Sequence, residues 1–317
     1  WNQDQERWTI TLETFRANGS PQIRTIKPFH IVQATGQSGQ SKMPIMDGMD
    51  QFVGHIMHSS EFKGAKEGGH GKTAVVVGAC NSAHDICHDL FNKGYDVTMV
   101  QRSSTAVITP GTLSQTLLAG LYCEDGPPVE DADLATWSMP AEITKAYGQQ
   151  LAQVQAHLDA PLLKGLTKAG FQINYGPDNA GFYMSYLQRG GGYYIDVGAS
   201  QLIIDGKIKV KSGCGVSKIL PHAIRLTDGT ELPADEIIFA TGYKNMRSQT
   251  QRIFGDKVAD QIEDVWGFDS EGEIRSMWRR TNHPGFWFMG GNLSLCRYYS
   301  RILALQIKAI HEGLQNK

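Results

Sequence analysis

Apolar and polar residues alternate in two similar stretches of the chain. Residues 8–34 have the pattern of a strand, a turn at Ala17-Asn18-Gly19 and a second strand from Ile23 to Ala34. Residues 223–242 repeat this pattern around an Asp228-Gly229 turn, and both stretches end in Ala-Thr-Gly. A repeated β-meander of this kind predicts two related nucleotide-binding domains.

Between these stretches, residues 72–102 have the pattern of a parallel βαβ unit. An apolar run starts at Thr73, a glycine-bearing turn and a helical pattern follow, and Asp96–Val100 reads as the next strand. Further along, the apolar spacing predicts helices over Ile143–Leu158 and Pro161–Ala169. The sequence therefore belongs to the α/β class, with helical segments between its strands.

Two other patterns add elements near the end of the chain. The runs 202–204 and 207–210 flank Asp205-Gly206 and predict a hairpin. Residues 298–314 predict a closing helix, whose apolar face consists of Leu303, Ile307, Ile310 and Leu314.

Composition limits the classes of function. The chain has 317 residues, 41% of them hydrophobic, and a net charge of -2, which fits a soluble globular protein and gives no basic field to attract nucleic acid or anionic lipid. Its longest apolar run, residues 73–80, is far shorter than the roughly 20 residues of a membrane span. The oligomeric state leaves no mark in the sequence.

The cysteines and histidines also limit the chemistry. The five cysteines are widely spaced and form no C-x-x-C pair, which favours reduced thiols in the cytoplasm and argues against a redox dithiol. No set of cysteines and histidines has the spacing of a zinc site, so no metal is predicted.

The turn after residues 73–77 is a candidate pyrophosphate site. Such turns aim the N–H groups of a helix amino terminus at phosphate, and small residues let the ligand approach closely. Cys80 replaces the second glycine of the usual G-x-G-x-x-[GA] motif, and an ordinary strand-to-helix turn explains the segment equally well. The candidate residues of this turn are Gly78, Cys80, Asn81, Ser82 and Ala83.

Arg102 follows the second strand of the βαβ unit. An enzyme specific for NAD carries an acidic residue there to bind the ribose diol, whereas a cation suits the 2′-phosphate of NADP. The position therefore predicts NADPH over NADH. The alternative is a solvated surface arginine.

A longer motif lies upstream of this unit. Phe52, Gly54, His58 and Phe62 match F-x-G-x-x-x-H-x-x-x-[FY]. This segment resembles the identifying sequence of the flavin-containing monooxygenases, and its final aromatic residue is similar to the N-hydroxylating and indole-3-pyruvate branches. Without the resemblance, the two phenylalanines would be core residues and His58 a buried histidine with satisfied hydrogen bonds.

The resemblance extends over nearly the whole chain in the same order. It implies an α/β fold with two Rossmann-like dinucleotide-binding domains, in which the NADPH domain is inserted in a partial FAD domain. The implied segments are a partial FAD-binding domain (1–47), a linker with the motif (48–72), an NADPH-binding domain (73–245) with a helical insertion (103–200), and a return to the FAD-binding domain (246–317). The further cofactor-binding residues that it implies are Thr35, Gly36, Ala240, Thr241, Gly242, Asn292 and Leu293. Asn292 and Leu293 follow Gly290-Gly291, which without the resemblance would be a plain loop.

The resemblance also implies a reaction. NADPH would reduce FAD, O2 would add to the reduced flavin at C4a, and the resulting C4a-(hydro)peroxyflavin would insert one oxygen atom into a small organic substrate. Because the flavin performs the transfer, no catalytic acid or base is assigned to the chain. Such families begin with a G-x-G-x-x-G unit for FAD, which we expect to be missing before Trp1. The alternatives are an NADPH-dependent flavin reductase and a truncated, non-catalytic NADPH-binding protein.

Overall fold

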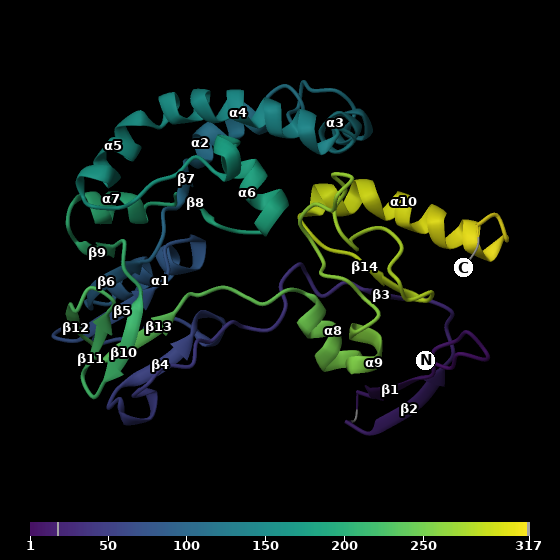
Figure 1. Ribbon diagram of the computed structural model, residues 1–317, viewed down its shortest axis with the longest axis horizontal. Coiled ribbons are helices and arrows are strands. Elements are labelled where there is room, and N and C mark those ends of the chain that lie inside the picture. The colour runs from purple at the N-terminus through teal and green to yellow at the C-terminus, as the bar shows by residue number, and fades with distance from the viewer. Residues whose placement is uncertain (18, 316–317) are drawn as a thin grey trace. The chain divides into compact units, whose positions relative to one another are not determined.

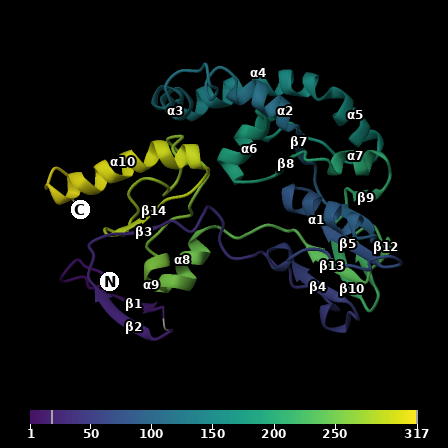
Figure 2. The same ribbon diagram turned by 180° about the vertical axis from the view of Figure 1, so that it is seen from behind.

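The computed structural model describes residues 1–17 and 19–315 (Figure 1; Figure 2 shows the same chain from behind). The chain forms two compact units. Unit 1 consists of Trp1–Gln40, Asp133–Ser138 and Lys244–Lys317, and unit 2 consists of Ser41–Ala132 and Met139–Tyr243.

Unit 2 is built around a five-stranded parallel sheet with the order β4-β13-β5-β6-β9. The strands are β4 (His55–His58), β5 (Thr73–Val77), β6 (Asp96–Gln101), β9 (Ile208–Ser212) and β13 (Glu236–Phe239). Both faces of the sheet are covered. Ala74 and Val76 pack on one face and Val75 on the other, which explains why β5 is a continuous apolar run.

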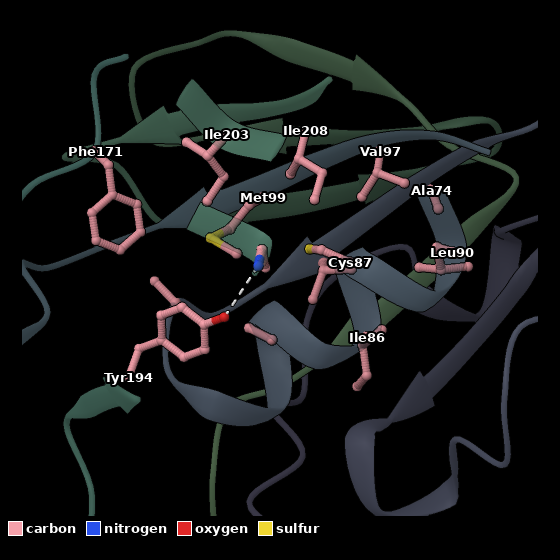
Figure 3. Close-up of a cluster of buried hydrophobic side chains, with 14 of the residues drawn as sticks. Ala74, Ile86, Cys87, Leu90, Val97, Met99, Phe171, Tyr194, Ile203 and Ile208 are labelled. Atoms are coloured by element: carbon pink, nitrogen blue, oxygen red, sulfur yellow. Dashed lines mark hydrogen bonds between the residues drawn. The ribbon is translucent and has the colours of Figure 1, made fainter. Parts of the chain in front are cut away.

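Helices α1 (Asn81–Asn92) and α7 (Ala199–Ile204) cover the first face. Figure 3 shows Cys87 and Leu90 of α1 and Met99 of β6 among the buried side chains of this cluster. The second face is covered by a three-stranded antiparallel sheet. Its strands are β10 (Val216–Leu220), β11 (Ala223–Leu226) and β12 (Glu231–Pro233).

Residues 103–198 hold most of the remaining elements of unit 2. Two short parallel strands, β7 (Ala106–Ile108) and β8 (Tyr193–Ile195), flank the helices. The helical elements are α2 (Pro110–Leu113), a π-turn η3 (Ser114–Leu118), α3 (Val129–Trp137), α4 (Ala141–Leu158), α5 (Ala160–Lys168), η4 (Pro177–Asn179) and α6 (Gly181–Arg189). The second half of α3 belongs to unit 1. Single 3-10 turns, η1 (Met49–Gln51) and η2 (Ser59–Glu61), flank β4.

The described residues of unit 1 form an antiparallel hairpin, a parallel strand pair and helices α8, α9 and α10, besides the second half of α3. The elements are β1 (Ile10–Phe15), β2 (Pro21–Ile26), β3 (Ile31–Gln33), α8 (Arg247–Phe254), α9 (Asp256–Ala259), β14 (Phe286–Phe288) and α10 (Leu293–His311). Its core includes an aromatic group in which Trp8 stacks on His283 at 5.0 Å between ring centroids. The indole N–H of Trp8 donates to the carbonyl oxygen of Gly285 at 2.9 Å.

The predicted βαβ unit is confirmed as β5, α1 and β6, and the predicted central helices are confirmed as α4 and α5. The prediction of a hairpin at 205–206 is wrong, because residues 202–204 lie in the helix α7. The apolar stretch 23–34 is divided into β2 and β3. Asn18 of the predicted first turn lies outside the described residues.

The closing helix begins earlier than predicted. It starts at Leu293, where Asn292 caps it, and ends at His311. Leu303 and Ile310 are buried as expected, but the prediction for Leu314 is wrong, since that side chain is 78% exposed beyond the end of the helix. The helical spacing therefore identified the buried face, and its last member falls past the C-cap.

Candidate dinucleotide-binding site

The turn after β5 is held tightly between its neighbours. Gly78 has a φ of 139°, and a Cβ at this position would lie 2.4 Å from the carbonyl oxygen of Ala240. Its N–H donates to the carbonyl oxygen of Val100 at 3.0 Å. Only glycine fits this backbone without strain, so the glycine of the predicted motif is required by the fold itself.

The predicted residues after Gly78 form the start of α1. Cys80 is the N-cap residue; burial raises the pKa of its thiol, which also receives a backbone hydrogen bond from Gly192. Asn81 accepts a hydrogen bond from the backbone N–H of Ile195 at 2.9 Å. Ser82 is exposed, whereas Ala83 is buried. The Cys80 side chain is thus bonded to the segment before β8.

His84, which sequence reasoning missed, completes the first turn of α1. Its Nδ1 donates to the carbonyl oxygen of Cys80 at 3.0 Å, and its ring stacks on Tyr194 at 3.6 Å between centroids. The ring is fully buried, and burial lowers its pKa to about 4. Among the described residues, no group bonds the buried Nε2. Because His84 lies inside a predicted helix, the sequence pattern did not indicate that its ring would be buried beside the turn.

Arg102 is exposed, one residue after β6 ends. Because β5 and β6 are parallel and Val77 pairs with Val100, Arg102 and the Gly78 turn lie at the same edge of the sheet. Ligands of open α/β sheets bind at this carboxyl edge. The structure therefore brings these predicted residues to one edge.

The Ala240-Thr241-Gly242 segment follows β13 at the same edge. The hydroxyl of Thr241 donates to the carbonyl oxygen of Lys42 at 2.7 Å, and the carbonyl oxygen of Gly242 accepts from the backbone N–H of Lys42 at 2.9 Å. The Thr241 hydroxyl and the Gly242 carbonyl of this segment therefore already make hydrogen bonds within unit 2.

The motif residues Phe52, Gly54, His58 and Phe62 have visible packing roles. The two phenylalanines pack against the two core clusters of unit 2. A Cβ on Gly54 would lie 2.0 Å from the carbonyl oxygen of Asp235. His58 is 2% exposed, and its Nε2 donates to the carbonyl oxygen of Gly242 at 2.9 Å. The motif therefore joins β4 to β13 and its following segment.

A second group of predicted residues meets in unit 1. Strands β3 and β14 are parallel, so Thr35-Gly36 and the segment from Gly290 leave the same end of this pair. A Cβ on Gly290 would lie 2.9 Å from the carbonyl oxygen of Gly36. Asn292 caps α10 by accepting from the N–H of Leu295 at 2.8 Å, and Leu293 is 87% exposed. A long helix amino terminus beside two glycine-rich segments suits an electron-rich ligand group.

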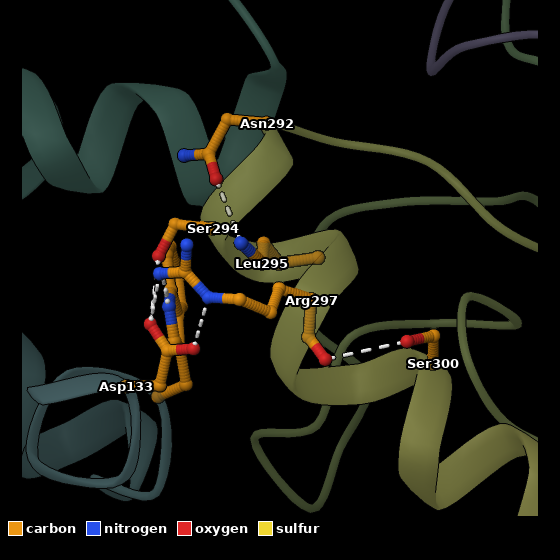
Figure 4. Close-up of polar contacts among 7 residues, drawn as sticks. Asp133, Asn292, Ser294, Leu295, Arg297 and Ser300 are labelled. Atoms are coloured by element: carbon orange, nitrogen blue, oxygen red, sulfur yellow. Dashed lines mark hydrogen bonds and ion pairs between the residues drawn. The ribbon is translucent and has the colours of Figure 1, made fainter. Parts of the chain in front are cut away.

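An ion pair at the first turns of α10 was also missed from the sequence. Arg297 makes two 2.7 Å hydrogen bonds to the carboxylate of Asp133, which is 4% exposed (Figure 4). Ser294 bridges this carboxylate and the indole N–H of Trp137 at 3.2 and 2.9 Å. Asp133 and Arg297 are 164 positions apart in the sequence, which explains why no local pattern revealed the pair.

Two features are absent from the described part of the chain. Residues 1–17 and 19–315 contain no group of three or more His, Cys, Asp or Glu side chains that could hold a metal ion. No helix within the same ranges has both the length and the apolar character needed to cross a membrane.

Known proteins resemble this chain in sequence. Residues 19–118 match the family described as pyridine nucleotide-disulphide oxidoreductase. The chain is 29% identical over 247 residues to Arabidopsis thaliana YUCCA10, named a probable indole-3-pyruvate monooxygenase, covering 77% of this chain and 56% of that protein. It is 30% identical over 215 residues to the indole-3-pyruvate monooxygenase YUCCA1 of Oryza sativa subsp. japonica, covering 68% and 47%. The chain thus spans about half the length of the curated relatives it matches.

Solved structures resemble it in fold. An open crystal structure of cyclohexanone monooxygenase aligns with a TM-score of 0.58 at 13% identity, covering 98% of this chain and 67% of that one. The OTEMO complex with FAD and NADP aligns at 0.56 and 14% identity, covering 98% and 66%. These alignments confirm the predicted α/β fold with two dinucleotide-binding domains. The sequence relatives, which carry monooxygenase names, support the resemblance of this chain to the flavin monooxygenases that its motif order predicts.

Proposed function

We propose that this chain binds NADPH and FAD and acts in a monooxygenase that inserts one oxygen atom from O2 into a small organic substrate. The observation that carries the proposal is the carboxyl edge of the unit 2 sheet, where the Gly78 turn, the start of α1 and Arg102 meet. The OTEMO structure was determined with FAD and NADP, and the sequence relatives carry monooxygenase names, which supports this assignment.

The residues of unit 2 fit a dinucleotide. Gly78 lets the backbone turn closely over β13, and the exposed Ser82 lies in the first turn of α1. Cys80 occupies the position of the second glycine in the usual phosphate-binding motif, and its thiol has a hydrogen bond from the backbone of Gly192. In this proposal Asn81 and Ser82 hold the pyrophosphate, and Arg102 pairs with the 2′-phosphate.

The residues of unit 1 fit a flavin. Gly36 and Gly290 approach within a distance that excludes a side chain, and the amino terminus of α10 follows directly at Leu293. In this proposal Thr35, Gly36, Asn292 and Leu293 contact FAD. The flavin, when bound, supplies the activation of O2, while the chain binds, orients and excludes water.

The test is binding of NADPH and NADH by calorimetry to the wild type and to Arg102→Ala, with an absorbance spectrum for bound FAD. We expect NADPH to bind at least tenfold more tightly than NADH, in line with about 1.4 kcal/mol or more for a paired phosphate, and Arg102→Ala to remove this preference. Arg24→Ala, another exposed arginine, should keep it. Equal binding of both nucleotides by the wild type would contradict the proposal.

Oxygen use separates the proposed activity from electron transfer alone. With both cofactors bound, NADPH oxidation and O2 uptake should proceed together, and an accepted substrate should acquire one oxygen atom from 18O2. A chain that oxidises NADPH without oxygenating any substrate in a panel of amines, thioethers and 2-oxo acids would be a reductase.

A further inference from the structure

A groove of about 540 Å³ lies within unit 2 between α4 and the loop of residues 175–180. This volume is within the range of small-molecule sites, about 300–1,000 Å³. On the α4 side, Ala152 and Ala156 are one helical turn apart, and their small side chains leave room for a ligand. Gln149 and Gln153 line the groove beside them. No residue proposed above for cofactor binding lines the groove.

The opposite wall has an unusual backbone. Asp178 and Asn179 have φ values of 52° and 58°, a left-handed conformation that is uncommon for residues other than glycine. Such conformations persist where the surroundings hold them, and they cluster at ligand-binding positions. Here the N–H of Gly181 closes the loop on the carbonyl oxygen of Tyr175 at 2.7 Å.

Two contacts from α4 fix the loop further. Lys145 pairs with the carboxylate of Asp178 at 2.8 Å, and the amide of Gln149 donates to the carbonyl oxygen of Asp178 at 3.0 Å. The wall therefore has its shape without a ligand. Because Lys145 balances the one carboxylate in the lining, the groove favours an uncharged ligand group.

The groove offers a ring face and free amide groups. Tyr175 lines the groove and is 46% exposed. Within residues 1–17 and 19–315, no hydrogen bond engages the amide side chains of Gln153 and Asn179. Amide side chains pair with the adjacent donor and acceptor of an adenine edge, and aromatic rings stack on nucleobases. These groups together match a flat ring that carries an amino group.

The groove begins next to the strand end that carries Arg102. The amide of Asn174 donates to the hydroxyl of Ser104 at 3.0 Å, and Ile173 pairs with Thr105. The loop with Tyr175 thus starts beside Ser104 and Thr105, two and three positions after Arg102.

We propose that this groove binds a purine ring. The ring has two possible sources: the adenine of NADPH, which rests on the proposed function, and a free purine nucleoside, which does not. Adenosine carries the ring alone, so it tests the groove without help from Arg102 or from the start of α1.

The experiment measures adenosine and NADPH binding by calorimetry to the wild type and to two groove variants, Tyr175→Ala and Gln153→Ala. Matched controls are Tyr147→Ala and Gln150→Ala, exposed residues of the same types on α4 outside the groove. Each groove variant should weaken adenosine binding at least about fivefold, Tyr175→Ala through the loss of one stacked base contact and Gln153→Ala through the loss of a hydrogen bond, and the controls should change it less than twofold. Far-UV circular dichroism should show that all four variants are folded.

The NADPH titrations identify the source of the ring. If the groove variants also weaken NADPH, the cofactor's adenine occupies the groove; if they weaken adenosine alone, the ring comes from a free purine. Adenosine binding without any NADPH binding supports the groove and contradicts the proposed function. The groove proposal is overturned if the wild type does not bind adenosine and NADPH is insensitive to both groove variants, or if the controls lose as much affinity as the groove variants.

Discussion

The Nε2 of His58 donates a 2.9 Å hydrogen bond to the carbonyl oxygen of Gly242, 184 residues further along the chain. The ring also stands edge-on to Tyr243 at 5.4 Å between centroids. Its Nδ1 accepts from the backbone N–H of Ser60 at 3.1 Å, which leaves Nε2 as the protonated nitrogen. His58 therefore fixes the segment after β13 to the end of β4.

His58→Ala should lower the stability of the chain by about 1–3 kcal/mol, because it leaves the N–H of Ser60 without its acceptor and opens a cavity. The midpoint of urea unfolding, followed by circular dichroism, measures this. His55→Ala on the same strand is the control, since His55 is exposed, and it should change the stability by less than about 0.5 kcal/mol. Similar effects of the two substitutions would contradict the structural role of His58.

Gly54→Ala should destabilise the chain by more than about 2 kcal/mol, since the new Cβ would lie 2.0 Å from the carbonyl oxygen of Asp235, a backbone atom that cannot move aside cheaply. Gly191→Ala serves as the control, because a Cβ at Gly191 meets nothing within 4 Å. Thermal unfolding of the two variants measures the difference. Unchanged melting of Gly54→Ala would show that the steric reason given for this motif glycine is mistaken.

Asp133→Asn should cost about 1–3 kcal/mol, because it removes the charge from a buried carboxylate that makes two hydrogen bonds with Arg297. The matched control is Glu231→Gln, which breaks a similar contact with Arg225 on an exposed hairpin. That pair should contribute less than about 1 kcal/mol. Unfolding in urea at two salt concentrations measures the stability loss of each variant. Equal losses would mean that the Asp133–Arg297 pair contributes no more than an ordinary surface ion pair.

Stability should fall between pH 7 and pH 5 because of His84. Burial lowers its pKa from 6.5 to about 4, so the unfolded chain takes up a proton in this window while the folded chain does not. A lowered folded-state pKa of a base means stability that is present above pH 6.5 and lost as the pH falls toward 4. The expected contribution between pH 7 and pH 5 is about 2 kcal/mol.

His84→Phe isolates this contribution, since phenylalanine can still stack on Tyr194 but does not titrate. Urea unfolding at pH 7 and pH 5 should show a smaller loss for the variant than for the wild type. Parallel losses in the two proteins would mean that the buried imidazole does not remain neutral.

Local sequence patterns correctly predicted those elements whose residue types are set by their immediate surroundings. The run from Thr73 to Val77 is apolar at every position after the first because both of its faces are buried, and the glycine after it is required by Ala240. The order of the motifs predicted the fold, which the solved structures confirm. The roles of the individual cofactor-binding residues stay predictions.

Residues 199–206 show where local patterns fail. A short apolar run beside Asp205-Gly206 fits a hairpin or a helix end equally well. The helix forms because two side chains accept hydrogen bonds from its first backbone N–H groups. Asp196 accepts from the N–H of Ser200 at 3.2 Å, and the hydroxyl oxygen of Tyr194 accepts from the N–H of Ala199 at 3.3 Å. Gly206, with a φ of 70°, then follows the end of a helix and not a hairpin turn.

Residues 133–138 are the one middle segment of the chain that belongs to unit 1. A shortened protein made by joining residue 40 to residue 244 would contain both ends of unit 1 and would still lack this piece. The guanidinium of Arg297 would then lose its carboxylate, and Ser294 would lose the indole of Trp137. Attempts to express unit 1 separately should therefore supply residues 133–138, for example as a grafted helix beside α10.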